Sequence, residues 1–168
     1  KIKLFTLFLF LSVSVCAQNK PSTTNKLVVV SSYNQYLASI KTDPNNELVE
    51  INKAIPNIKL DIRYATKNNF MRQIMYKQAR AFARKPVVEL LKKIQRELNK
   101  NGYGLKIFDG YRPYAITVEF YKKASDKNFV ANPAKGSKHN RGCAVDLTLI
   151  NLKTGKELPM PTPYDSFS

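Results

Sequence analysis

The stretch from Ser137 to Asp146 contains the side chains whose types and spacing point most directly to chemistry. His139 is the only histidine among the 168 residues, and Asp146 follows it seven positions later. Imidazole and carboxylate groups are both ordinary zinc ligands, and catalytic zinc sites usually combine three protein ligands with a water molecule. The pair is therefore a candidate metal site. The alternative is a surface histidine near a solvated aspartate.

The residues after Gly142 alternate in a way that is typical of a strand. One predicted face carries Cys143, Val145, Leu147 and Leu149, and the other carries Ala144, Asp146 and Thr148. We therefore expect the histidine on a loop and the carboxylate on the inner face of a strand. Cys143 has the opposite parity to Asp146, so we expect its side chain to pack rather than to bind a metal.

Arg112 is a third candidate, in the turn Asp109-Gly-Tyr-Arg-Pro113 after a short predicted strand over residues 105–108. A guanidinium beside a metal would stabilise the oxyanion that forms when water attacks an amide carbonyl. The alternative is a structural arginine that pairs with Asp109 across the turn. The spacing alone leaves both interpretations open.

The elements that must position these side chains follow from apolar periodicity. Residues 58–64 alternate as a half-buried strand, and residues 71–84 are expected to be loop plus a short helix. Pro86 begins the clearest helix, which Asn101-Gly102 ends. Its apolar face comprises Val87, Leu90, Leu91, Ile94 and Leu98.

A second helix is expected from Pro113 to about Ala124, and residues 153–156 are typical of a hairpin turn. Mixed helices and strands with antiparallel hints indicate an α+β protein, with a small, mainly antiparallel sheet and flanking helices. The length of 168 residues and the 43% apolar content suit one domain with a real core.

The N-terminal residues are typical of an export signal. Lys1 and Lys3 precede an apolar run over residues 4–15, and Val15-Cys16-Ala17 is a small-residue cleavage pattern. We therefore predict a signal peptide over 1–17 and a periplasmic or secreted protein, without stable membrane insertion after cleavage. A lipoprotein with its lipid on Cys16 is the alternative. Residues 18–46, rich in Asn, Ser, Thr and Lys, are expected to be a linker with room for one added strand.

The net charge of +16 raises the question of nucleic acid as a partner. Export argues against that partner, and the basic residues are scattered along the chain rather than gathered in one stripe. We therefore expect no nucleic-acid binding. A positive surface that faces an anionic cell envelope accounts for the charge.

The two motifs together, Asp109-Gly-Tyr-Arg-Pro113 and Ser137-x-His139-x-x-Gly142-x-Ala144-x-Asp146, resemble those of the D-alanyl-D-alanine dipeptidase family. These are zinc enzymes related to the vancomycin-resistance dipeptidase. The resemblance covers about residues 47–168, and three further segments look like the same family: Leu60-Asp-Ile-Arg-Tyr-Ala-Thr66, Asn69-Phe70 and Gly155-Lys-Glu-Leu-Pro-Met160. A zinc D,D-peptidase-like fold is what the resemblance implies.

The resemblance also implies roles. His139 and Asp146 would be zinc ligands, and Arg112 would stabilise the transition state. Ser137 and Asp165 would line the substrate pocket, with Asp165 holding the ammonium group of the dipeptide. Without the family, Ser137 could be a turn hydroxyl and Asp165 a solvated loop carboxylate. The implied activity is zinc-dependent hydrolysis of D-alanyl-D-alanine in cell-wall peptide turnover.

The sequence departs from the family in one respect. The family has a Glu-x-x-His pair near its C-terminus that supplies the general base and the third ligand, whereas this chain has no histidine besides His139. We therefore expect a fragment truncated at both ends, which alone binds zinc weakly and is a poor enzyme, while the parent protein is a zinc dipeptidase. The alternatives are a non-catalytic wall-binding relative, a D,D-carboxypeptidase of the same superfamily and a basic nucleic-acid binder.

Overall fold

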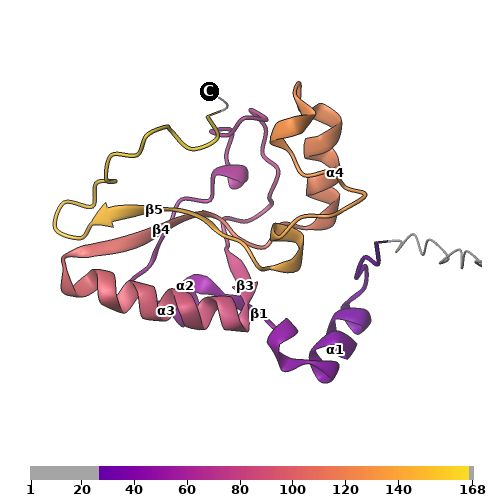
Figure 1. The fold of residues 1–168 in the computed structure, drawn as a ribbon, viewed down its shortest axis with the longest axis horizontal. Helices are drawn as coiled ribbons and strands as arrows, with labels where there is room; N and C mark the ends of the chain where they lie inside the picture. The colour runs from indigo at the N-terminus through magenta and orange to yellow at the C-terminus, as the bar shows by residue number, and fades with distance from the viewer. Residues whose placement is uncertain (1–26, 167–168) are drawn as a thin grey trace, which may run out of the picture.

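The computed structural model of the chain describes residues 27–166, and a three-stranded sheet lies at its centre (Figure 1). The middle strand is β4 (Tyr103–Asp109). It pairs in parallel with β2 (Lys59–Leu60) on one edge and antiparallel with β5 (Asp146–Asn151) on the other. The longest run of strand pairing is therefore the antiparallel β4–β5 ladder, and the predicted α+β class is confirmed.

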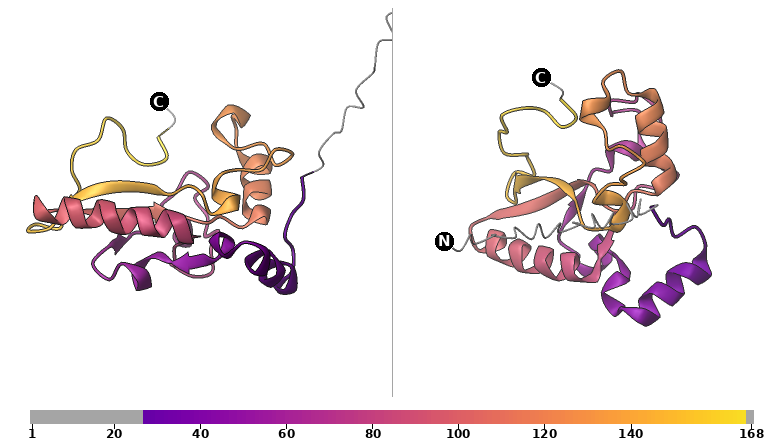
Figure 2. Two further views of the ribbon diagram at one scale, coloured as in Figure 1. Left: turned by 60° about the horizontal axis from the view of Figure 1, so that its bottom comes forward. Right: turned by 45° about the vertical axis from the view of Figure 1, so that its right-hand side comes forward.

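A second, two-stranded sheet and two helices complete the main core. β1 (Leu48–Glu50) pairs antiparallel with β3 (Phe82–Arg84), and α2 (Ile51–Ala54) follows β1 directly. The long helix α3 (Lys85–Lys100) runs along the three-stranded sheet, as both views of Figure 2 show. The buried cluster between these elements comprises Ile51, Ile55, Ile58, Ile62, Ala81, Ala83, Val88, Leu91, Leu105 and Ile107.

Helix α3 begins and ends close to the predicted bounds, but its buried face differs from the predicted one. Leu90 and Ile94, predicted to face the core, are 58% and 48% exposed. The buried positions are Val88, Leu91 and Gln95. Gln95 is buried because its amide oxygen accepts a hydrogen bond from the Leu105 N–H of β4 at 2.8 Å, which compensates for its desolvation. The helix is thus rotated from the orientation that apolar periodicity alone predicts.

Two other predicted elements are corrected. The strand predicted over residues 58–64 is limited to β2, after which the chain turns through the 3₁₀ helix η2 (Arg63–Ala65). The alternating burial is real, because Ile62 and Tyr64 are 4% and 2% exposed, but it accompanies a turn. Residues 71–84 contain β3 and no helix.

Helix α4 (Tyr114–Lys123) confirms the second predicted helix to within a residue at each end. Figure 1 shows it on the far side of β4 and β5 from α3. The turn predicted over residues 153–156 is also present, because the N–H of Gly155 donates to the Asn151 carbonyl and Ile150 pairs with Glu157 across it.

The expected linker contains a helix in its described part rather than an added strand. Helix α1 (Tyr33–Thr42) begins at a capping box, in which the Ser32 hydroxyl accepts from the backbone of Gln35 and the Gln35 side chain reaches back to Ser32. The 3₁₀ helix η1 (Pro44–Asn46) follows. The signal peptide predicted over 1–17 lies outside the described residues. Within residues 27–166, no helix has the length and apolar character needed to cross a membrane.

Candidate metal centre

Two carboxylates and the histidine meet at one end of the β4–β5 ladder. Asp109 is the last residue of β4 and Asp146 the first of β5, and the register pairs them across the ladder after an irregularity at Ile107. His139 opens the 3₁₀ helix η4 (His139–Arg141), and the N–H of Arg112 donates to its carbonyl at 3.1 Å. The loop histidine and strand carboxylate expected from the sequence therefore come together.

The imidazole of His139 is oriented by the main chain. Its Nδ1 lies 2.9 Å from the carbonyl oxygen of Gly110, and because a carbonyl only accepts, Nδ1 is the protonated nitrogen. Nε2 then faces Asp146, whose Oδ1 is 3.5 Å away, and in the neutral ring this nitrogen has the lone pair that can bind a metal. A carbonyl that fixes the second ring nitrogen is the usual support of a metal-binding histidine.

The separation of these two atoms fits zinc. Two ligand atoms on a tetrahedral zinc, each bonded at about 2.0–2.2 Å, lie about 3.4 Å apart. The 3.5 Å between His139 Nε2 and Asp146 Oδ1 is close to that value. These two residues can therefore hold one zinc ion with little rearrangement.

Asp109 joins the same cluster, since its ligand atoms and those of His139 and Asp146 lie within 4.8 Å of one another. Its oxygens are already occupied, however. Oδ1 accepts from the Tyr76 hydroxyl at 2.8 Å and from the Gly110 N–H at 2.9 Å, while Oδ2 accepts from Arg112 Nε at 3.0 Å and Nη2 at 2.7 Å. Four donors use the acceptor capacity of a carboxylate. We therefore assign Asp109 to positioning Arg112 rather than to binding metal.

Arg112 is a fixed cation beside the histidine–aspartate pair. Its guanidinium stacks over the rings of Tyr64 and Phe120 at 5.3 and 4.8 Å, and Nη2 lies 3.8 Å from Asp146. Burial lowers the pKa of Arg112, but the Asp109 carboxylate together with Tyr64 and Tyr76 outweighs burial and the pKa is raised. The two interpretations that the sequence left open are thus compatible, because Arg112 pairs with Asp109 and also borders the candidate site.

The charges of the pair reinforce each other. Burial and the Arg112 cation lower the pKa of His139, but the Asp146 carboxylate and the Gly110 carbonyl together outweigh them and the pKa is raised. Burial raises the pKa of Asp146, and His139 together with the Arg112 cation outweighs it, so that the pKa is lowered. Relative to an isolated histidine, the pair therefore stabilises the protonated ring beside a carboxylate, and a metal ion that binds Nε2 competes with that proton.

Asp165 belongs to the same neighbourhood. The Tyr64 hydroxyl donates to its Oδ1 at 3.1 Å, and the Phe70 N–H donates to its Oδ2 at 3.4 Å. The adjacent Tyr164 hydroxyl donates to Asp146 at 3.3 Å. Asp165 is a half-buried residue with a left-handed φ of 59°, and burial raises the pKa of its carboxyl. It is therefore held beside the candidate site rather than solvated on a loop.

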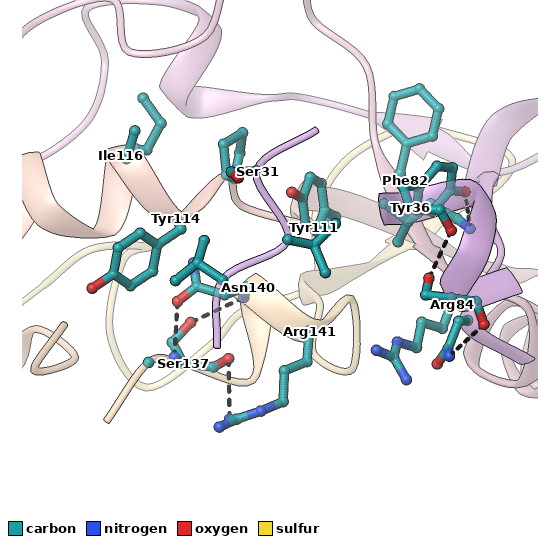
Figure 3. Close-up of a pocket in the computed structure, with 18 of the residues that line it drawn as sticks. Ser31, Tyr36, Phe82, Arg84, Tyr111, Tyr114, Ile116, Ser137, Asn140 and Arg141 are labelled. Carbon is teal, nitrogen blue, oxygen red and sulfur yellow. Dashed lines mark hydrogen bonds between the residues drawn. The ribbon is translucent and has the colours of Figure 1, made fainter. Parts of the chain in front are cut away.

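Ser137 lies in a different environment. Its hydroxyl accepts from the Asn140 N–H at 3.2 Å, and its own N–H donates to the Asn140 side chain at 2.8 Å. Figure 3 shows both residues in a pocket whose described lining does not include His139 or Asp146. These contacts match the turn-hydroxyl alternative.

The prediction that Cys143 packs is wrong, because its side chain is exposed and free. β5 begins only at Asp146, so the strand alternation does not extend back to residue 143. Within the strand the parity holds, since Thr148 and Ile150 are 3% and 2% exposed while Leu147 is 38% exposed. The cluster at Asp146 comprises Asp109 and His139 and does not include Cys143.

Comparison with known proteins identifies the family. The model of the peptidase M15 family of D-Ala-D-Ala dipeptidases matches residues 44–168. The chain belongs to this family. The match includes every strand and helix that surrounds the candidate metal centre, and it begins after α1.

Curated relatives agree with this family. The chain is similar to the D-alanyl-D-alanine dipeptidase of Escherichia coli K12, with 31% identity over 119 residues, which are 71% of this chain and 61% of the relative. It is also similar to the enzyme of that name in Enterococcus faecium, with 30% identity over 68% of this chain and 67% of the relative. A relative of the same name in Enterococcus faecalis is 28% identical. The chain thus spans 61% of the length of the E. coli relative.

Proposed function

We propose that the protein hydrolyses the D-alanyl-D-alanine dipeptide with a zinc ion held by His139 and Asp146. The observation that carries the proposal is the 3.5 Å separation of His139 Nε2 and Asp146 Oδ1, with Nδ1 fixed by the Gly110 carbonyl. The printed names of the relatives support the substrate. Turnover of cell-wall peptides is the proposed biological role.

The side chains of the candidate site have separate roles in the proposed hydrolysis. Zinc, when bound, polarises the scissile carbonyl and the attacking water. Arg112 has five N–H groups, of which Asp109 accepts two, so the others can donate to the oxyanion of the tetrahedral intermediate. Asp165 accepts the ammonium group of the substrate, which fixes the dipeptide relative to the carbonyl that is attacked.

His139 and Asp146 are two of the three protein ligands that a catalytic zinc site usually has. A Glu-x-x-His pair is not available around the single histidine, because Gly136 stands three residues before His139. We propose that residues 1–168 alone bind zinc weakly and hydrolyse the dipeptide slowly. Efficient hydrolysis also requires a third zinc ligand and a general base, so activity is tested with the complete gene product.

We further propose that the protein is exported. The basic and apolar residues 1–15, followed by Val15-Cys16-Ala17, support cleavage of a signal after Ala17, and lipid attachment at Cys16 is the alternative. Mass spectrometry of the N-terminal peptide of exported protein distinguishes cleavage after Ala17 from lipid attachment at Cys16. An N-terminus that still carries residues 1–15 would contradict export by this signal.

The proposed activity is tested with the complete gene product. D-alanine release and bound zinc are measured for the unaltered protein, for His139→Ala, for Asp146→Ala and for Asp126→Ala. Asp126 only accepts a hydrogen bond at the start of a 3₁₀ turn, so it is the matched control for loss of an aspartate. We expect the first two variants to lose zinc and about 10³-fold or more in rate, and the control to keep both.

Unchanged zinc content and rate in His139→Ala would overturn the assignment. Faster cleavage of a pentapeptide ending in D-alanyl-D-alanine than of the dipeptide would favour the D,D-carboxypeptidase alternative. Binding to cell walls without hydrolysis by the unaltered, zinc-loaded protein would favour the non-catalytic relative.

A further inference from the structure

A pocket of about 1120 Å³ lies apart from the metal centre, between α1, α4 and η4 (Figure 3). One wall is formed by residues 27–33 and the start of α1, and another by the first turn of α4 and residues 136–141. Tyr111, β3 and residues 75–78 complete it. The proposed hydrolysis uses none of the side chains that carry the following argument.

The charged side chains that line this pocket are all positive. Lys77, Arg80, Arg84 and Arg141 line it, and none of its described lining residues is Asp or Glu. Arg80 is neutralised by Glu50, which accepts from it at 2.8 and 2.7 Å. Within residues 27–166 the other three cations form no ion pair. The pocket therefore carries cationic side chains whose charge is not matched by the protein.

Two of these cations are neighbours. The N–H of Arg84 donates to the Gly142 carbonyl at 2.9 Å, which brings β3 against the residue that follows Arg141. Among the described residues, the hydrogen-bond partners of the Arg141 guanidinium are main-chain carbonyls, those of Ser137 at 3.4 Å and Lys135 at 3.3 Å. In Figure 3 the Arg141 side chain extends towards Ser137, whereas Arg84 lies near Tyr36 and Phe82. Two guanidinium groups carried by adjacent segments offer an acidic ligand two separate sites for carboxylates.

The remaining walls are apolar and aromatic. Tyr114 and Ile116 of α4 face the pocket, and Val28 and Tyr33 on the opposite wall are 88% and 71% exposed. A ligand that matches both features carries negative charges and apolar side chains in one flexible strand. An acidic peptide has both, whereas a phosphate polymer offers no apolar side chains and a lipid surface is too flat to enter a pocket.

We propose that this pocket binds a partner protein through an extended acidic peptide segment with interleaved apolar side chains. Carboxylates of the segment pair with Arg84 and Arg141, and apolar side chains pack on Tyr114 and Ile116. The pocket backs onto the metal centre, because Asn140 in its lining donates to the Arg112 carbonyl at 2.9 Å. Binding is nevertheless independent of zinc and of hydrolysis, so the proposal is separable from the proposed enzymatic activity.

The probe is a fluorescein-labelled short peptide of alternating leucine and glutamate, and its control replaces every glutamate by glutamine. Fluorescence anisotropy at several salt concentrations gives the affinity of the full chain for both. We expect the glutamate peptide to bind and its affinity to fall as the salt concentration rises. We expect the affinity of the glutamine peptide to be lower by about tenfold or more.

The decisive comparison uses two double variants with equal loss of charge. Arg84→Gln/Arg141→Gln removes two cations that line the pocket, and Lys93→Gln/Arg96→Gln removes two exposed cations of α3. We expect about tenfold weaker binding for the first and less than about a threefold change for the second. Lys77→Gln, an exposed position, provides a second test that does not depend on the fold of the arginine variant, with about threefold weaker binding expected.

Several outcomes would overturn the proposal: no binding of the glutamate peptide, equal losses in the two double variants, or equal binding of the glutamine peptide. Displacement of the glutamate peptide by inorganic polyphosphate at equal charge concentration would show that the pocket selects charge alone, which would overturn an acidic peptide as its ligand.

Discussion

Asp109 holds Arg112 by two hydrogen bonds to a single carboxylate oxygen, at 3.0 Å from Nε and 2.7 Å from Nη2. Both side chains are removed from water, with 1% and 11% exposure. The second oxygen is anchored by Tyr76 and by the Gly110 N–H. The guanidinium is therefore oriented before any substrate arrives, so little reorganisation accompanies its interaction with a developing negative charge.

The first prediction concerns Asp109→Asn. Loss of the carboxylate leaves Arg112 buried without a counter-charge, so we expect the free energy of unfolding to fall by about 3 kcal/mol. We expect the hydrolysis rate of the complete protein to fall about 100-fold because the oxyanion donor loses its orientation. Bound zinc should remain, since Asp109 has no free acceptor site. Urea unfolding, D-alanine release and metal analysis measure the three quantities.

The matched control is Asp61→Asn, which breaks a partly exposed pair with Arg63 and Lys106. Solvent screening limits its expected cost to about 1 kcal/mol or less. Loss of zinc from Asp109→Asn with zinc retained by the control would contradict the assignment and make Asp109 a metal ligand.

The second prediction concerns the pH dependence of zinc binding. The Asp146 carboxylate and the Gly110 carbonyl together outweigh burial and raise the pKa of His139 above its ordinary value of 6.5, so a proton competes with zinc for Nε2 up to a higher pH than usual. We expect affinity to rise with pH, by about tenfold per pH unit below the raised pKa, and to level off above it. Isothermal titration of the metal-free chain across this range measures it. Asp165→Asn, which removes a carboxylate without a ligand role, should keep the slope, and a flat profile for the unaltered chain would contradict the prediction.

The motifs predicted the candidate site better than they predicted the helix packing. The parity of β5 correctly placed Asp146 on the same face as Thr148, and the glycine-containing turn after β4 brought Arg112 to the same end of the sheet. These features depend on local sequence. The role of Asp109 was visible only as one of two alternatives for Arg112, because its other partner, Tyr76, comes from a segment 33 residues away.

The packing errors have a tertiary cause. Apolar periodicity favoured Leu90 and Ile94 for the buried face of α3, yet Gln95 is buried because it bonds the main chain of β4. Likewise the strand predicted through residue 64 ends at Leu60, because Tyr64 turns into the ring cluster around Phe70 and Phe120. The groups that Gln95 and Tyr64 contact are not adjacent to them in the sequence. Apolar periodicity and strand propensity alone could therefore not predict these contacts.

The third prediction concerns Gly110→Ala. A Cβ at this position would lie 2.5 Å from the Phe82 carbonyl oxygen, a main-chain atom of β3 that also accepts from the Tyr111 N–H at 2.6 Å. Relief of the clash requires the turn and β3 to separate, so we expect a loss of about 2–3 kcal/mol in the free energy of unfolding. Gly102→Ala is the control, because its φ is +77° but no atom lies within 4 Å, and it should cost about 1 kcal/mol. An equal cost in urea unfolding of the two variants would refute the close approach.

The last prediction concerns Glu50, which joins β1 to the segment before β3. Its carboxylate accepts from Arg80 at 2.8 and 2.7 Å and lies 3.0 Å from Lys53, and these partners lower its pKa from 4.5 to about 2. The folded-state pKa is depressed, so the stabilisation is present above pH 4.5 and is lost as the pH falls towards about 2.

We therefore expect the unaltered chain to be more stable than Glu50→Gln at about pH 6 and the difference to shrink as the pH falls from 4.5 to about 2, as thermal unfolding across this range would measure. Glu97→Gln, on the exposed surface of α3 beside Lys100, is the control for removal of a glutamate from an i,i+3 pair. A stability difference for Glu50→Gln that stays constant down to pH 2 would contradict this prediction. It would mean that protonated Glu50 stabilises the contact between β1 and the segment before β3 as much as the charged form does.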